Sequence, residues 1–126
     1  MKIEDQVLSI EQVLELQELG FDVIKNSSAI VIIKENGTFI VDREMIEKNI
    51  FGITDKIEDL FYSMTIGDII NIIPTEINEY VLDMNRECIS YDSTKNNLYY
   101  SSIYRFIDNL FDCLLWCIKH KYINLK

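Results

Sequence analysis

The sequence predicts an α+β fold, in which an antiparallel sheet built from two β-hairpins is covered on one face by a long C-terminal helix, with further short helices. Two groups of residues follow the period of two that is typical of strands, helical periods separate these groups, and an apolar helical pattern closes the chain. Hairpins grouped in this way favour an antiparallel sheet over a parallel one. With 126 residues, we expect a single domain spanning residues 1–126.

The first predicted helix runs over residues 9–19. Ser9 and Gln12 have the spacing of a capping box, and Gly20 is typical of a helix end. The apolar side of this helix is Ile10, Val13, Leu16 and Leu19. Its other side carries carboxylates at i, i+4 and i+7 with no cation between them, here called the acidic ridge: Glu11, Glu15 and Glu18.

The first hairpin is predicted from two β-branched and aromatic runs, residues 30–34 and 38–41. They are joined through Glu35, Asn36 and Gly37, and an Asn-Gly pair tolerates the positive φ angles of a tight hairpin turn.

Helices are predicted between the two hairpins. Ile46 and Ile50 fit one short helix, Gly52 separates it from the next, and Thr54 begins a second helix. The apolar residues of that second helix are Ile57, Leu60, Phe61 and Met64. Thr65 and Asp68 then form a pair resembling a capping box, which predicts a third helix that ends at Pro74.

The second hairpin is predicted from alternation in residues 79–85 and 88–92, with a turn near Arg86 and Glu87. Residues 92–97 are expected to form a loop, and residues 99–105 to lead into the closing helix, whose apolar pattern spans residues 102–118. The broad apolar face of that helix is Ile103, Phe106, Ile107, Leu110, Phe111, Leu114, Leu115 and Ile118.

The net charge of −9 is unevenly distributed, and residues 1–24 alone carry −5. An acidic surface repels phosphate backbones, which argues against direct nucleic-acid binding. The N-terminus has carboxylates where a signal peptide needs positive charge, and no apolar run approaches the ~20 residues that span a bilayer. We therefore expect a cytoplasmic protein that does not contact membranes. Its odd number of cysteines, three, predicts free thiols.

One constellation could hold a metal ion. Cys113, Cys117 and His120 share a helix face at i, i+4 and i+7, and Cys88 could be a fourth zinc ligand. The alternative interpretation treats both helical cysteines as small hydrophobic residues and places the histidine at a solvated helix end. Because the sequence lacks a Cys-x-x-Cys knuckle, we expect no metal. We expect no other cofactor either.

No catalytic residue is predicted. The single histidine has no local pattern linking it to a nucleophile, the carboxylate pairs fall on faces expected to meet water, and the four glycines are isolated rather than grouped in a phosphate loop.

A tyrosine-rich segment is the second candidate partner surface besides the acidic ridge. Tyr99, Tyr100 and Tyr104 stand close to Arg105, and tyrosine with arginine is the mixture enriched at interface centres. The same residues could instead form a lid over the sheet.

Three stretches of the chain carry a resemblance to other proteins: residues 8–22, 65–74 and 114–123. They contain Leu8-Ser9-Ile10-Glu11-Gln12, Thr65-Ile66-Gly67-Asp68-Ile69-Ile70 and Leu114-Leu115-Trp116-Cys117-Ile118. The chain resembles uncharacterised small proteins encoded by gut bacteria and their prophage-like elements. This resemblance implies an accessory role and assigns no activity.

The leading functional hypothesis is a non-catalytic, acidic, intracellular interaction protein that acts through a protein partner or as a homo-oligomer. The first alternative is an inhibitor of a basic partner, of the immunity, antitoxin or nucleic-acid-mimicking kind, in which helix carboxylates replace phosphates. A small enzyme or a zinc-binding protein is a further alternative.

Overall fold

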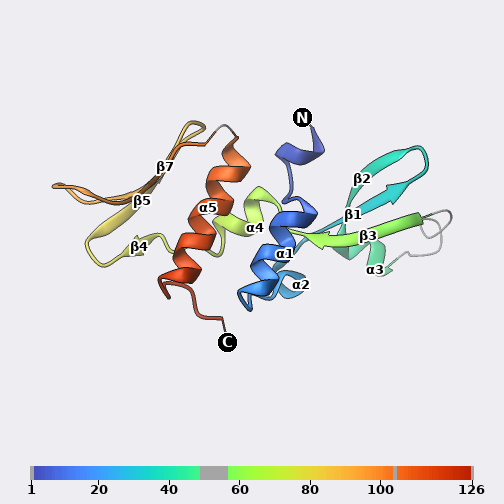
Figure 1. Ribbon diagram of the computed structural model, residues 1–126, viewed down its shortest axis with the longest axis horizontal. Coiled ribbons are helices and arrows are strands. Elements are labelled where there is room, and N and C mark those ends of the chain that lie inside the picture. The colour runs from blue at the N-terminus through green and yellow to red at the C-terminus, as the bar shows by residue number, and fades with distance from the viewer. Residues whose placement is uncertain (1, 49–56, 104, 126) are drawn as a thin grey trace. The chain divides into compact units, whose positions relative to one another are not determined.

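The computed structural model describes residues 2–48, 57–103 and 105–125 (Figure 1). The chain forms two compact units, Met1–Asp68 and Ile69–Lys126. Each contains one antiparallel sheet, of three strands in the first unit and four in the second. The predicted α+β class is therefore confirmed, with a C-terminal helix that packs on strands. A single domain over residues 1–126 stays a prediction.

The first unit contains a short 3₁₀ helix, three α-helices and three strands. In chain order they are η1 (Ile3–Asp5), α1 (Ile10–Glu18), α2 (Val23–Asn26), β1 (Ala29–Lys34), β2 (Gly37–Asp42), α3 (Arg43–Lys48) and β3 (Ile57–Ser63). The strand order is β2-β1-β3, with both pairs antiparallel. The first predicted hairpin is confirmed, with the Lys34–Gly37 pair closing a two-residue turn.

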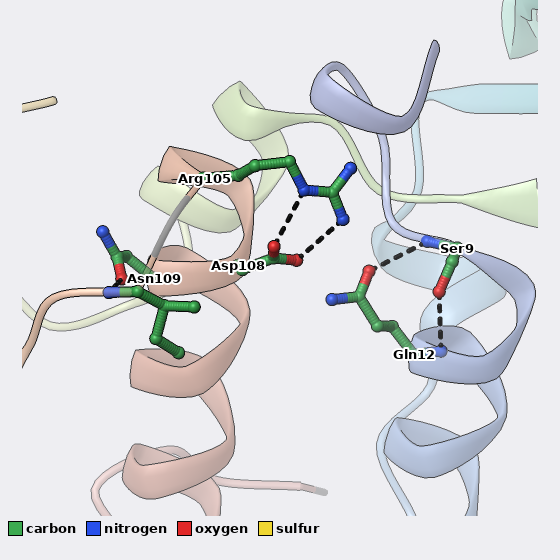
Figure 2. A network of polar contacts seen from close by, with 6 residues as sticks. Ser9, Gln12, Arg105, Asp108 and Asn109 are labelled. Carbon is green, nitrogen blue, oxygen red and sulfur yellow. Dashed lines mark hydrogen bonds and ion pairs between the residues drawn. The ribbon is translucent and has the colours of Figure 1, made fainter. Parts of the chain in front are cut away.

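Both predicted capping pairs are present. The Ser9 side chain accepts from the Gln12 amide at 3.2 Å, and the Gln12 side chain accepts from the Ser9 amide at 2.9 Å (Figure 2). Thr65 and Asp68 bond reciprocally at 3.0 and 3.1 Å, and α4 (Ile66–Ile70) follows. This helix ends earlier than the prediction, which placed its end at Pro74.

Strand β1 is the centre of the first unit, because its first four residues, Ala29–Ile32, are buried on both sides of the sheet. On the side here called face A, Ala29 and Val31 pack with Val7, and Ile3, Ile40 and Phe61 lie against them. On the opposite side, face B, Ile30 and Ile32 pack with Val41 and Tyr62. The central strand thus has an apolar layer on each face.

The helix predicted to begin at Thr54 is wrong over residues 57–63, which form strand β3. Leu60 and Tyr62 lie opposite Ile32 and Ile30 of β1. The spacing of the apolar residues here fits a helix as well as a strand. The strand forms because it pairs with the second edge of β1 and so covers the buried central strand. Phe and Tyr also favour strands. Gly52 and the predicted helix start at Thr54 lie outside the described residues.

The second unit pairs a four-stranded sheet with a long helix. Its elements are β4 (Glu76–Ile77), β5 (Tyr80–Met84), β6 (Ile89–Asp92), β7 (Asn97–Ser101) and α5 (Phe106–Lys119). The strands lie in sequence order, and α5 contacts β6 and β7. The second predicted hairpin is confirmed, and its turn is held by the Asn85 side chain, which accepts from the amides of Glu87 and Cys88. The two hairpins belong to separate sheets.

The segment before α5 differs from the prediction. Residues 97–101 form strand β7, which pairs with β6, so the loop is only residues 93–96, where the Ser93 amide donates to the Asn96 carbonyl at 2.9 Å. The closing helix begins at Phe106 rather than Ser102, and Ile103, predicted on its buried face, is 47% exposed.

Buried Asn109 explains why the helix starts late. Its side-chain oxygen accepts from the Ile103 amide (Figure 2). The same oxygen accepts from the Ser101 hydroxyl at 3.3 Å, and the amide nitrogen of Asn109 donates to the Glu87 carbonyl at 3.4 Å. These bonds tie residues 101–103 to Asn109 outside the helix. At the first turn, Arg105 and Asp108 form an ion pair at 2.8 Å.

Helices α1 and α5 both end in a Schellman motif, but with different residues at the left-handed position. After α1, Gly20 has a φ of 87°, and the Phe21 amide donates to the Leu16 carbonyl at 3.0 Å. After α5, Lys121 has a φ of 62°, and the Tyr122 amide donates to the Cys117 carbonyl at 2.8 Å. A side chain at this position is strained, whereas glycine is not.

We predict that substitutions at these two positions have opposite effects on stability. Gly20→Ala should lower the free energy of unfolding by about 1 kcal/mol, because alanine resists positive φ. Lys121→Gly should raise the free energy of unfolding, because glycine relieves the strain of positive φ. The gain should be less than about 1 kcal/mol, because glycine also increases the entropy of the unfolded chain. Urea unfolding followed by circular dichroism measures both, and destabilisation by Lys121→Gly would contradict the strain argument.

Candidate binding pocket

A pocket of about 340 Å³ lies over face A in the first unit. This is at the small end of the roughly 300–1,000 Å³ range of ligand pockets. Its apolar lining comes from the N-terminal segment and from the sheet: Ile3, Val7, Leu8, Ile10, Val31, Ile33 and Phe61. Its polar lining is Glu4, Ser9, Glu11 and Thr38. An apolar pocket bordered by carboxylates suits an apolar group that lies next to a positive charge.

The N-terminal segment forms one wall of the pocket because it is held at both ends. The Leu8 amide donates to the Met64 carbonyl at 3.1 Å, and the Ser63 hydroxyl donates to the Leu8 carbonyl at 2.7 Å. These bonds place Val7 and Leu8 beside the end of β3. At its other end the segment folds into η1, which contacts β2. The pocket is the part of face A that the segment leaves uncovered.

The acidic ridge is exposed, and its members differ in their relation to the pocket. Glu11, Glu15 and Glu18 all have exposed side chains on α1. Glu11, in the first turn of α1, lines the pocket, and Glu15 and Glu18 do not. Glu4 of η1 supplies the second carboxylate of the lining. The sequence pattern therefore predicts one charged residue of this pocket.

The tyrosine-rich segment is divided between the two faces of the second sheet. Tyr99 is 8% exposed, its ring lies 4.6 Å from that of Trp116 between centroids, and its hydroxyl donates to Asp112. Tyr100, the next residue along β7, is 58% exposed. Tyr104 lies outside the described residues. Tyr99 is thus part of the core, while Tyr100 faces solvent, and both belong to a strand of the sheet rather than to a lid over it.

The cysteines and the histidine do not form one cluster. Cys113 and Cys117 are fully buried on α5, Cys88 is half-buried, and all three are free thiols as predicted. His120 is exposed and packs its ring on Trp116, with 5.0 Å between centroids. Among the residues that the structure describes, no three or more His, Cys, Asp or Glu side chains are placed to hold a metal ion.

Burial and hydrogen bonding shift the pKa values of tyrosine and cysteine side chains in the core of the second unit. It raises the pKa of the Tyr91 phenol well above its ordinary value, and the neighbouring Cys117 adds to this rise. Burial likewise raises the pKa of Tyr99, and its hydrogen bond to Asp112 contributes. The hydrogen bond between the two helical thiols raises the pKa of Cys113 and lowers that of Cys117. Both tyrosines are therefore held as neutral hydroxyls.

Sequence reasoning missed most of the pocket. Ile3 and Val7 belong to a short segment that has no periodic pattern, and Ile33 and Thr38 lie near the turn end of a hairpin whose faces become distinct only once the sheet has formed. The available signal is the apolar pair Val7-Leu8 directly before the capping box. An apolar residue at this position often packs against the helix it precedes.

Comparison with known proteins gives no matching family model, no matching curated protein and no matching solved structure. The resemblance to small proteins of gut bacteria accordingly stays a prediction. Within the described ranges, no helix has the length and apolar character needed to cross a membrane.

We predict that alkaline pH destabilises the second unit through Tyr91 and Tyr99. Unfolded tyrosine ionises near pH 10, whereas both folded phenols have raised pKa values, so their contribution is complete below pH ~10 and is lost as pH rises further. Each should lower the free energy of unfolding by about 1.4 kcal/mol per pH unit above that point. The fluorescence of Trp116, the only tryptophan, follows unfolding in urea at each pH.

The matched variants are Tyr91→Phe and Tyr99→Phe. Each should remove the contribution of one tyrosine to this slope, the fall in the free energy of unfolding with pH. Tyr100→Phe changes an exposed tyrosine of the same strand and should leave the slope as it is. Equal slopes in all three variants would contradict the assignment.

Proposed function

We propose that this protein is a non-catalytic interaction protein whose pocket over face A takes a large apolar side chain of a partner protein, next to a lysine or arginine. The observation that carries the proposal is the composition of the pocket, in which apolar side chains form the walls and the two ionisable groups are both carboxylates, Glu4 and Glu11.

The apolar part of the contact supplies most of the affinity. Burying one Leu or Phe side chain contributes about 1.5–3 kcal/mol, whereas an exposed ion pair contributes roughly 0.2–1 kcal/mol. The carboxylates instead select among partners, because they repel an apolar ligand that carries a carboxylate, such as a fatty acid, and attract a basic peptide. The net charge of −5 on residues 1–24 extends this preference beyond the pocket.

Selection of phage-displayed random linear peptides against the full-length protein tests the proposal. Enriched peptides should combine a large apolar residue with a nearby Lys or Arg. Failure to enrich any sequence over a selection without protein would overturn it, as would enrichment of acidic peptides.

The apolar wall is tested with Ile10→Gln. Ile10 lines the pocket and is 38% exposed, so we predict that this variant folds normally and binds a selected peptide about tenfold more weakly, which corresponds to about 1.4 kcal/mol. Leu14→Gln is the matched control, because Leu14 is 51% exposed on the same helix and outside the pocket. Isothermal titration calorimetry measures both, and equal losses would place the peptide elsewhere.

The carboxylates are tested with Glu11→Gln, which should weaken binding about two- to fivefold at low salt and less at high salt. Glu18→Gln removes the same charge from the same helix at a position outside the pocket. It should change the dissociation constant by less than twofold, and a loss as large as that of Glu11→Gln would contradict a contact in the pocket.

A second candidate function is inhibition of a basic partner through the whole acidic ridge, and the exposure of all three ridge carboxylates supports it. The double variant Glu15→Gln/Glu18→Gln separates the two candidates. This double variant leaves the pocket intact. Binding of a selected basic peptide should therefore persist if the pocket is the binding site, and it should be lost if the acidic ridge is the binding site.

A further inference from the structure

The outer edge of β2 has backbone groups that point away from the sheet. The two-residue turn makes Lys34–Gly37 a hydrogen-bonded pair, and bonded pairs alternate along an antiparallel ladder. The Arg43 amide, which donates to the Ser28 carbonyl at 2.9 Å, fits the same alternation. The amides and carbonyls of Thr38, Ile40 and Asp42 therefore face outward.

Apart from the contact of η1 with β2, this edge has little of the protection that natural sheets usually carry. Exposed edges are commonly blocked by lysine, proline, a bulge or a covering element. Strand β2 contains neither lysine nor proline, and its register with β1 is regular. Phe39 is 43% exposed on it. In the described part of the chain, β2 is a terminal strand of its sheet, and no backbone hydrogen bond joins the outward groups of Thr38 and Ile40 to another segment.

The open edge adjoins the pocket. Thr38 lines the pocket and lies opposite Ile33, so both belong to face A. A strand added beside β2 would lie about 4.8 Å from it and direct every second side chain toward the same face. One of those side chains would then lie next to Thr38, at the mouth of the pocket.

We infer that the partner segment binds as an additional strand along the outer edge of β2, with alternate side chains toward face A and one apolar side chain in the pocket. This inference rests on the proposed function and specifies how the partner binds. Main-chain hydrogen bonds to Thr38 and Ile40 hold the segment, the pocket selects the apolar side chain, and Glu4 with Glu11 selects a neighbouring Lys or Arg.

The occupant is an extended, basic and apolar peptide of another protein. A second copy of this chain fits less well, because its own edge strand Gly37–Asp42 has no cation to place beside the two carboxylates and ends in an aspartate.

Backbone methylation of the peptide tests strand addition directly. A peptide selected on the protein is synthesised with one amide N-methylated at a time, and binding is measured by calorimetry. We expect methylation to weaken binding at least tenfold at alternate positions and less than twofold at the positions between, because only every second amide faces β2. Uniform losses, or losses spaced three to four residues apart, would overturn strand addition.

The protein side is tested with Thr38→Pro, which removes one outward donor and leaves the bonds to β1 intact. It should fold and bind the peptide at least tenfold more weakly, whereas Thr38→Val, which keeps the amide, should bind within about twofold. Binding unchanged in Thr38→Pro would overturn the inference. If that variant does not fold, the methylation series decides.

These outcomes separate the inference from the proposed function. Peptides that lose affinity with Ile10→Gln but show no alternation leave the pocket as the site and reject the added strand. Self-association of the protein that Thr38→Pro abolishes would assign the edge to a second copy and also reject the inference. Failure to select any peptide rejects the proposed function itself.

Discussion

The first unit depends on the burial of one strand on both sides. Ala29–Ile32 are four consecutive apolar residues in the central strand, and each is at most 2% exposed. At about 25 cal/mol per Å² of apolar surface removed from water, such a strand stabilises the unit only if both faces of the sheet are covered. Strands β2 and β3 pair with its two edges, and further apolar side chains cover each face. On face A the cover is the N-terminal segment, which is short, and the pocket is the area it leaves open.

Much of the fold could be predicted from the sequence, wherever the signal is local. Capping pairs such as Ser9 with Gln12 satisfy backbone amides within one turn. The hairpin follows from a local signal too, although Gly37, with a φ of 145°, starts β2 directly after the turn residues Glu35 and Asn36. The sequence pattern mispredicts two elements whose identity depends on distant partners. Ile57–Ser63 fits a helical period as well as a strand, and only the free edge of β1 decides between them. Asn97–Ser101 is a strand because β6 lies beside it.

The candidate site was less predictable than the fold for the same reason. The i, i+4, i+7 pattern of the ridge predicts Glu11, but its position beside Glu4 in one pocket lining depends on where the N-terminal segment crosses the sheet. In the second unit, the sequence pattern treats the tyrosine-rich segment as one group, either a partner surface or a lid. Strand alternation instead places Tyr99 against Trp116 and Tyr100 in solvent. Tyr99 and Tyr100 are adjacent in the chain but lie on opposite faces of the sheet. Which face is buried depends on how the sheet packs, and the local sequence pattern does not show this.

The proposed recognition of a peptide uses the pocket and the edge of β2 together. The most direct measurement is a titration of selectively methyl-labelled isoleucines with a selected peptide, followed by NMR. The account predicts that the methyl signals of Ile3, Ile10 and Ile33 shift in proportion to occupancy, while those of Ile89, Ile107 and Ile118 in the second unit do not. Shifts confined to the second unit would contradict it.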